Sequence, residues 1–251
     1  RVKWNGKFAS PMNGHRFVFS LDPYLKALVK NKKGGSKGAG IGLIMFDEDN
    51  EVRHFEPGGK ERASYYHTPA FFCTYYARPQ SMDVFHEDIL KLCHYFSMPL
   101  AFENNVDLIA DYFVKRGYED FILKSSDFID VDLDRVNDMD RITPGCNMNQ
   151  QMKEKGIQLL ANFIEGIGNY LNGWEFSLVK EWRRFPFLDW LEDLLNFDYA
   201  DSEKNDRTMS CLPGLIYMDK IMKEKHYSYN QDNPTQEEEE FAELLEDDEY
   251  W

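Results

Sequence analysis

Short apolar runs separated by turn residues occupy much of the first half of the chain, and they predict a β-sheet. The first run, residues 17–24 (FVFSLDPY), combines aromatic and β-branched residues and ends on Asp22 and Pro23, as is typical of a buried strand. Further strands are predicted at 41–46, 51–56, 100–103 and 118–124. A tight turn at 47–50 joins two of them, so the first three predicted strands favour an antiparallel unit.

Helical periodicity follows this unit and alternates with the later strands. One apolar stripe within residues 84–96 consists of Phe85, Ile89, Leu92 and Phe96. Further helices are predicted from Asn105 to Gly117, over 149–171, over 187–197, and from 201–207 through Met218, the last with a kink at Pro213. The aromatic-rich segment 57–79 is expected to cover the sheet, and a short strand is expected at 174–182.

This order of elements predicts an α/β fold. Its sheet is expected to be mixed, with three antiparallel strands followed by parallel strands, and to carry helices on both faces. A chain of 251 residues with 43% hydrophobic content is large enough for one compact domain, which we place at residues 1–230.

Charge and cysteine content indicate an acidic tail and a reducing compartment. The net charge is −15, and nine of the acidic residues lie in 235–251, so residues 231–251 are expected to form a mobile acidic tail. Neither a membrane span nor a secretory pattern is recognisable. The four cysteines are widely spaced and contain no CxxC pair, which favours a reducing compartment over a zinc or disulfide framework. Because the chain begins on Arg1, we expect it to be a domain of a longer protein.

Acidic residues close two of the predicted strands. Asp22 ends the first and Glu103 the fourth, and a buried carboxylate needs either a cation or backbone amides, such as those of the turn at Pro23. If these strands are neighbours, the carboxylates repel each other unless a cation lies between them, and oxygen ligands favour magnesium or manganese. Asp206, near the start of the last helix, is either a helix cap or a third ligand.

A basic segment follows the first strand. Residues 25–40 combine several glycines with lysines and predict a flexible loop, which is either simply solvated or contacts nucleic-acid phosphates. The DNA-binding candidates within it are Lys30, Lys32, Lys33 and Lys37. The segment lacks GxxxxGK[ST] and is therefore not a nucleotide-binding P-loop. The spacing Asp130-x-Asp132-x-Asp134 lacks the glycine and glutamate of a calcium loop.

Four short motifs, taken in order, resemble the C-terminal nuclease domain of the large terminase subunit of tailed phages, above all of crAss-like phages. They are FSLDPY at 19–24, YARP at 76–79, LAFENN at 100–105 and NDR at 205–207. The resemblance covers residues 17–222 and implies a ribonuclease-H-like fold. It also implies a divalent-metal endonuclease that cuts concatemeric double-stranded DNA at the start and end of packaging, in the host cytoplasm.

By residue match, the resemblance makes Asp22 the carboxylate that bridges two Mg²⁺ or Mn²⁺ ions, and Glu103 and Asp206 the further ligands. Many relatives have adjacent acids in the third motif, so Asp201 or Glu203 is the alternative to Asp206. No Walker motif is present, and the terminase ATPase domain is therefore expected outside this chain. The portal and the small terminase subunit are further implied partners.

Two other functions stay open at this point. The domain is alternatively a non-catalytic docking module of a packaging motor, whose acidic tail binds a basic partner. A recombination or junction nuclease of the same fold would share the metal site and differ only in its DNA substrate, which fold analogy alone does not separate.

Overall fold

The computed structural model describes residues 2–14, 16–24, 37–44, 51–55, 61–65, 70–104, 108–129, 142–165, 187–198 and 205–232. Several predicted features lie outside these residues. They are Lys30, Lys32 and Lys33, the Asp-rich segment 130–141, the strand at 174–182, the alternative ligands Asp201 and Glu203, and the tail from residue 233 onward.

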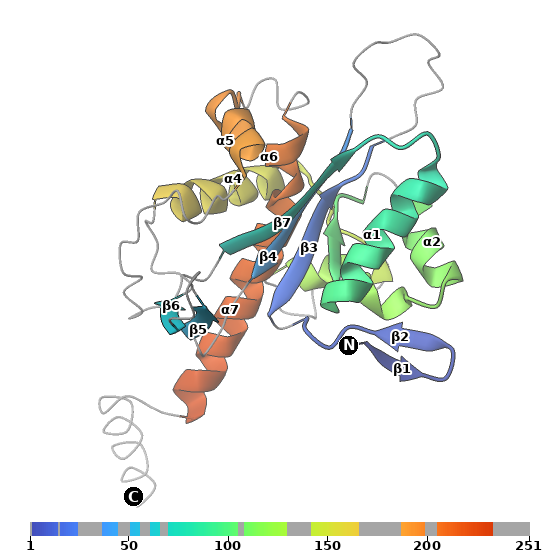
Figure 1. Cartoon of the computed structure of the whole chain (residues 1–251), viewed down its shortest axis with the longest axis horizontal. Coiled ribbons are helices and arrows are strands. Elements are labelled where there is room, and N and C mark those ends of the chain that lie inside the picture. The colour runs from blue at the N-terminus through green and yellow to red at the C-terminus, as the bar shows by residue number, and fades with distance from the viewer. Residues whose placement is uncertain are drawn as a thin grey trace, which may run out of the picture.

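A four-stranded mixed sheet forms the centre of the fold, in the order β7-β4-β3-β8 (Figure 1). Its strands are β3 (Phe17–Asp22), β4 (Gly38–Ile44), β7 (Ala70–Ala77) and β8 (Leu100–Phe102). β7, β4 and β3 are antiparallel, and β8 runs parallel to β3. The predicted mixed α/β sheet, with antiparallel strands followed by a parallel one, is confirmed at this level.

The third strand of this sheet is not the predicted one. β5 (Glu51–Phe55) pairs with β6 (Glu61–Tyr65) in a separate two-stranded sheet, and β7 takes its place beside β4. The aromatic segment that was expected to cover the sheet therefore supplies a strand. Aromatic residues and threonine fit a pleated, half-buried surface well. A run of aromatic residues therefore does not show whether a segment forms a strand or packs over the sheet.

The predicted strand at 118–124 is also wrong. Its centre is a 3₁₀ helix, η1 (Glu119–Phe121), and only isolated bridges at Ile122 and Lys124 remain of the expected pairing. Glu119 and Asp120 are exposed while the apolar residues around them are buried, so the segment contributes to the core without extending the sheet. A second 3₁₀ helix, η2 (Ser125–Phe128), follows, and a small hairpin of β1 (Lys3–Asn5) and β2 (Phe8–Ser10) precedes the sheet.

Helices cover both faces of the sheet (Figure 1). They are α1 (Met82–Phe96), α2 (Leu108–Lys115), α4 (Gln150–Glu165), α5 (Leu188–Leu195), α6 (Asp206–Ser210) and α7 (Leu212–Asp232). Alternation along β3 sends Phe19 and Leu21 into one core with α1 and α2, and Val18 into the other core with α4 and α7. Among the described residues, none of the helices combines the length and apolar character needed to cross a membrane.

The last predicted helix is two helices. α6 ends at Ser210, α7 begins at Leu212, and Pro213 is the second residue of α7. Proline is tolerated in a first helical turn, where its missing N–H has no intrahelical partner. One residue later, the Gly214 N–H donates to Ser20 Oγ at 2.7 Å and fixes the start of α7 on the centre of β3.

Candidate carboxylate site at the edge of the sheet

The pairing of β3 with β8 brings two of the predicted site residues to equivalent positions. Leu21 is the register partner of Phe102 in this parallel pair, so the next residues, Asp22 and Glu103, follow at the same end of neighbouring strands. Leu21 and Phe102 both lie in the core with α1 and α2. Because successive side chains alternate between faces, Asp22 and Glu103 are directed toward the opposite face, where α4, α6 and α7 lie.

Asp206 reaches the same edge from a different part of the chain. It is the first residue of α6, and its Oδ2 accepts a hydrogen bond from the Lys37 N–H at 3.1 Å. Lys37 directly precedes β4, in which Ala39 is the register partner of Asp22. We call Asp22, Glu103 and Asp206 the carboxylate site.

The charges of this site act on one another. Burial, together with the negative charges of Glu103 and Asp206, raises the pKa of Asp22 to about 8 from an ordinary value of 3.8. Burial also raises the pKa of Glu103. A carboxyl group in this environment favours its protonated form at neutral pH, and a cation at the site would remove that preference.

Lys153 supplies the opposing positive charge. It lies half-buried in the first turn of α4, and its charge lowers the pKa of both Asp22 and Glu103. The segment before α4 is fixed beside Glu103, since Cys146 N–H donates to the Phe102 carbonyl at 2.7 Å and Asn104 N–H donates to the Cys146 carbonyl at 3.0 Å. Lys153 could not be predicted from the sequence, because a lysine in an amphipathic helix gives no signal of its own.

The donor chemistry of the carboxylate site suits a hard divalent cation, but the side chains are not gathered around one point. Within the described ranges, no three His, Cys, Asp or Glu side chains stand close enough together to hold a metal ion. The Asp206 carboxylate is engaged by the Lys37 backbone. A metal held by all three residues would compete with this contact for the Asp206 carboxylate.

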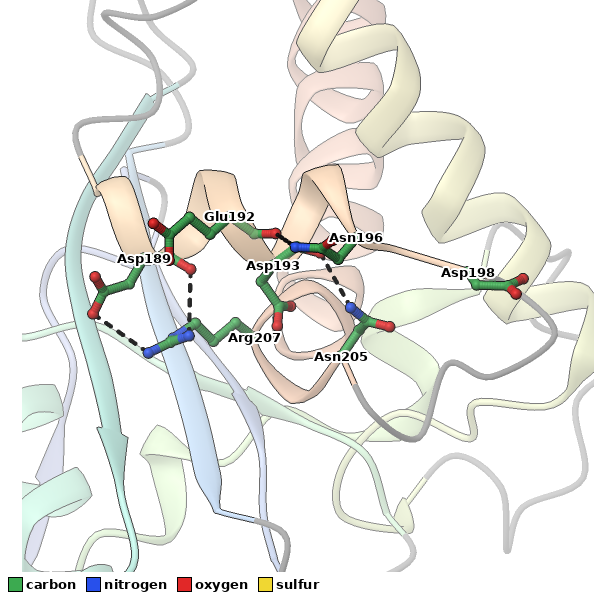
Figure 2. A pocket seen from close by; sticks show the side chains of 7 residues that line it. All are labelled: Asp189, Glu192, Asp193, Asn196, Asp198, Asn205 and Arg207. Carbon is green, nitrogen blue, oxygen red and sulfur yellow. Dashed lines mark hydrogen bonds and ion pairs between the residues drawn. The ribbon is translucent and has the colours of Figure 1, made fainter. Parts of the chain in front are cut away.

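A pocket of about 350 Å³ lies beside this edge, between α5 and α6 (Figure 2). Its lining is mostly acidic and consists of Asp189, Glu192, Asp193, Asn196, Asp198, Asn205 and Arg207. Asp193 Oδ2 accepts from both the backbone N–H and the Oγ1 hydroxyl of Thr208 at 2.8 Å, and Arg207 donates to Asp189 at 3.3 and 3.4 Å. These contacts hold the start of α6, and Asp206 with it, against α5.

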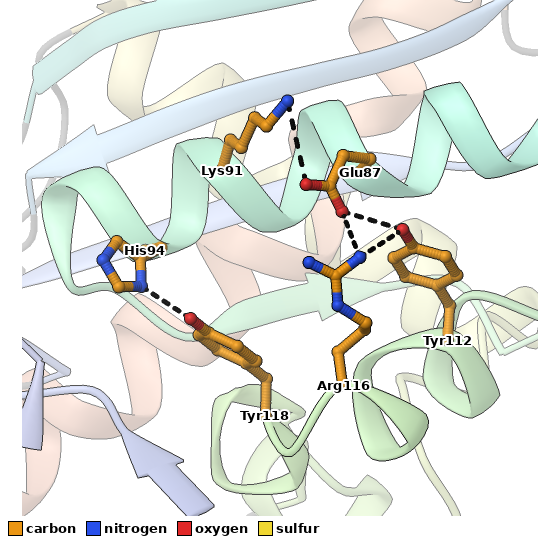
Figure 3. A network of polar contacts seen from close by, with 6 residues as sticks. All are labelled: Glu87, Lys91, His94, Tyr112, Arg116 and Tyr118. Atoms are coloured by element: carbon orange, nitrogen blue, oxygen red, sulfur yellow. Dashed lines mark hydrogen bonds and ion pairs between the residues drawn. The ribbon is translucent and has the colours of Figure 1, made fainter. Parts of the chain in front are cut away.

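A second polar network lies on the other face of the sheet and joins α1 to α2 (Figure 3). Glu87 accepts from Tyr112 at 2.7 Å and from Arg116 at 2.8 Å, and it pairs with Lys91 at 3.7 Å. The hydrogen bond from Tyr112 is the main cause of the lowered pKa of Glu87. Since its members satisfy one another, we interpret this network as a structural link between the two helices.

The predicted site residues thus divide into two groups. Asp22, Glu103, Asp206 and Lys37 lie at one edge of the sheet, whereas the other candidate lysines and alternative acids lie outside the described residues. No protein-family model matches the chain, and no curated protein matches it at a significant level.

Proposed function

We propose that this chain is a divalent-metal-dependent DNA endonuclease domain of the type found in the large terminase subunit of tailed phages. The observation that carries the proposal is that Asp22 and Glu103 follow the same end of two paired parallel strands, and that the charges of Glu103 and Asp206 both act on Asp22. Natural proteins keep such costly groupings of like charge chiefly where function needs them.

The fold is compatible with the proposed ribonuclease-H-like arrangement. Such a sheet has three antiparallel strands followed by parallel ones, and here β7, β4 and β3 are antiparallel while β8 is parallel to β3. The first acid closes the central strand β3 and the second follows its parallel neighbour. The third comes from a helix that packs on β3 and β4.

In this proposal the protein provides the ligands and the metal ions provide the reacting water. Asp22 would be the shared ligand of the Mg²⁺ or Mn²⁺ ions, and Glu103 and Asp206 would be the further ligands. Ions held there would activate a water for attack on a phosphodiester and would stabilise the leaving oxygen. Lys153 favours the charged, ligand-competent form of Asp22 and Glu103, because its positive charge lowers their pKa.

The substrate and partners follow from the terminase resemblance. We propose concatemeric double-stranded DNA as the substrate, cut when packaging starts and ends in the host cytoplasm. The terminase ATPase domain, the portal and the small terminase subunit are the proposed partners. The isolated chain is expected to bind DNA weakly, because its net charge of −15 repels the phosphates. Weak binding would suffice in a packaging motor, which supplies DNA at high local concentration.

Cleavage of supercoiled plasmid DNA in manganese tests the proposal. The parental chain should nick and linearise the plasmid, and D22N should lower the rate at least about 100-fold while retaining the parental circular dichroism spectrum. The matched control is D111N, which removes an exposed carboxylate of α2. A D22N protein that cuts at the parental rate would refute the proposal.

A non-catalytic docking module of the packaging motor is the second candidate function. It is favoured by one observation, that no three acidic, His or Cys side chains of the described part are gathered closely enough to hold a metal ion. Calorimetric titration with manganese separates the two functions. Binding that D22N and E103Q abolish supports the nuclease, whereas a lack of binding together with a salt-sensitive complex with a motor protein supports the module.

A further inference from the structure

Cationic side chains are held over tyrosine rings beside the carboxylate site. The Arg207 guanidinium lies 3.8 Å from the centre of the Tyr76 ring, and Lys37 Nζ lies 4.6 Å from the centre of the same ring. The Arg78 guanidinium lies 5.5 Å from the centre of the Tyr24 ring. Cation–π contacts of this kind orient a positive charge without neutralising it.

The strand register places these cations at the same edge of the sheet as Asp22. Gly38 pairs with Ala77 at the end of β4 and β7, so Lys37 and Arg78 stand one residue beyond this pair. Asp22 pairs with Ala39 on the other side of β4. Arg207 follows Asp206 directly in the chain.

Two of the three cations form no ion pair with a carboxylate in the described part of the chain. Lys37 and Arg78 are exposed, and within the described residues neither side chain has a carboxylate partner. Arg207 is the exception, because its side chain is 21% exposed and pairs with Asp189 Oδ2 at 3.4 Å. The Asp189 side chain is 80% exposed, and ion pairs with such an exposed partner are weak. Two exposed cations and one loosely paired arginine thus lie beside the carboxylate site, in a chain whose net charge is −15.

We propose that Lys37, Arg78 and Arg207 form a phosphate-binding rim that holds the backbone of duplex DNA against the carboxylate site. The inference rests on the proposed function for its substrate and adds the residues that bind it. Arginine presents donors in a planar fork that matches a phosphate, and lysine adds a point charge. Because the rim contacts phosphates rather than base edges, it predicts binding that does not depend on sequence.

Tyr76 and Tyr24 position the cations of the rim. Tyr24 is buried, and its hydroxyl donates to the Pro79 carbonyl at 3.1 Å, which fixes the ring beneath Arg78. Tyr76, on β7, contacts both Lys37 and Arg207 through its ring. Two rigid rings thus position three flexible cations, and less side-chain entropy is lost when DNA binds.

The test measures binding without cleavage. Fluorescence anisotropy of a labelled duplex, in EDTA and from about 20 mM to about 200 mM salt, gives both the Kd and the dependence of log Kd on log salt. The variant K37Q/R78Q/R207Q should weaken binding about 10-fold or more at the lowest salt and reduce the slope by about 0.9 for each lost contact. The control K3Q/K7Q/K115Q removes as many exposed charges from β1, its adjoining turn and α2, and should bind like the parental chain.

Two further variants distinguish loss of the rim from misfolding and from loss of cleavage. R78Q alone changes an exposed side chain and should reduce the slope even if the triple variant folds poorly. D22N should bind at least as well as the parental chain. Equal slopes for the parental chain and both rim variants, or no binding by the parental chain at the lowest salt, overturn the rim. Rim-dependent binding by a chain that never cleaves would keep the rim and refute only the nuclease.

Discussion

Asp22 and Glu103 occupy equivalent positions on two parallel neighbouring strands, each one residue beyond the paired Leu21 and Phe102. Both acids are only half-buried, yet burial is the first cause of the raised pKa of each. The fold thus holds two carboxyl groups at neighbouring strand ends, in an environment that disfavours the ionised form of each. This arrangement costs stability in the absence of a cation and gives the predictions below.

Replacing Asp22 should stabilise the metal-free chain. The pKa of Asp22 is about 8 in the folded chain and near 3.8 when unfolded, so the folded state binds more protons between these values. Stability from this group is therefore present below about pH 4 and is lost as the pH rises toward 8. In EDTA, urea denaturation should show D22N more stable than the parental chain at about pH 8, by on the order of a few kcal/mol, and much less so at about pH 5. Equal differences at both values would contradict the account.

Lys153 should set the pH range of activity. Its charge favours the ionised forms of Asp22 and Glu103, so K153Q should move the rising limb of the cleavage-rate profile to higher pH. K153R keeps the charge and should leave the limb in place. The profile in manganese is the measurement, and an unchanged midpoint for K153Q with a uniformly lower rate would show that Lys153 acts only by packing.

The third ligand can be assigned by comparing acids near the start of α6. Asp206 is predicted to be essential, because its charge, like that of Glu103, raises the pKa of Asp22. D206N should lose cleavage at least about 100-fold, whereas D201N and E203Q should cut at close to the parental rate. The plasmid assay measures all three, and loss of cleavage in D201N or E203Q with activity in D206N would reassign the ligand.

Gly214 should be the most size-sensitive contact between α7 and the sheet. A Cβ there would lie 2.6 Å from Ser20 Cβ and 2.9 Å from Leu43 Cδ1, so G214A must push α7 away from β3. The expected cost is about 1–3 kcal/mol of unfolding free energy. G14A is the control, because its Cβ would meet Pro99 at an ordinary 3.6 Å. Thermal or urea unfolding gives both values, and equal stabilities would contradict this packing.

The elements predicted correctly from sequence are those whose signal is local. Residues 17–22 form β3 because the run is apolar and short, and α1 follows its apolar stripe. β7 was missed because its aromatic residues fit both a strand and a cover. The break before α7 was missed because Pro213 fits both a kink and a helix start.

The residues of the candidate site also include some that could be predicted from sequence and some that could not. Asp22 and Glu103 could be predicted as neighbours because each closes an apolar strand, and pairing of those strands is confirmed. Their role as metal ligands stays a prediction. Lys153 and the stacking of Arg207 on Tyr76 could not be predicted, because both depend on how distant helices and strands pack and leave no periodic pattern in the sequence.

Anomalous diffraction from crystals soaked in manganese tests the central claim most directly. The account predicts one or two anomalous peaks within coordination distance of carboxylate oxygens of Asp22, Glu103 and Asp206, and their disappearance in D22N crystals treated in the same way. Manganese that binds elsewhere on the chain while this edge of the sheet stays without a peak would contradict it.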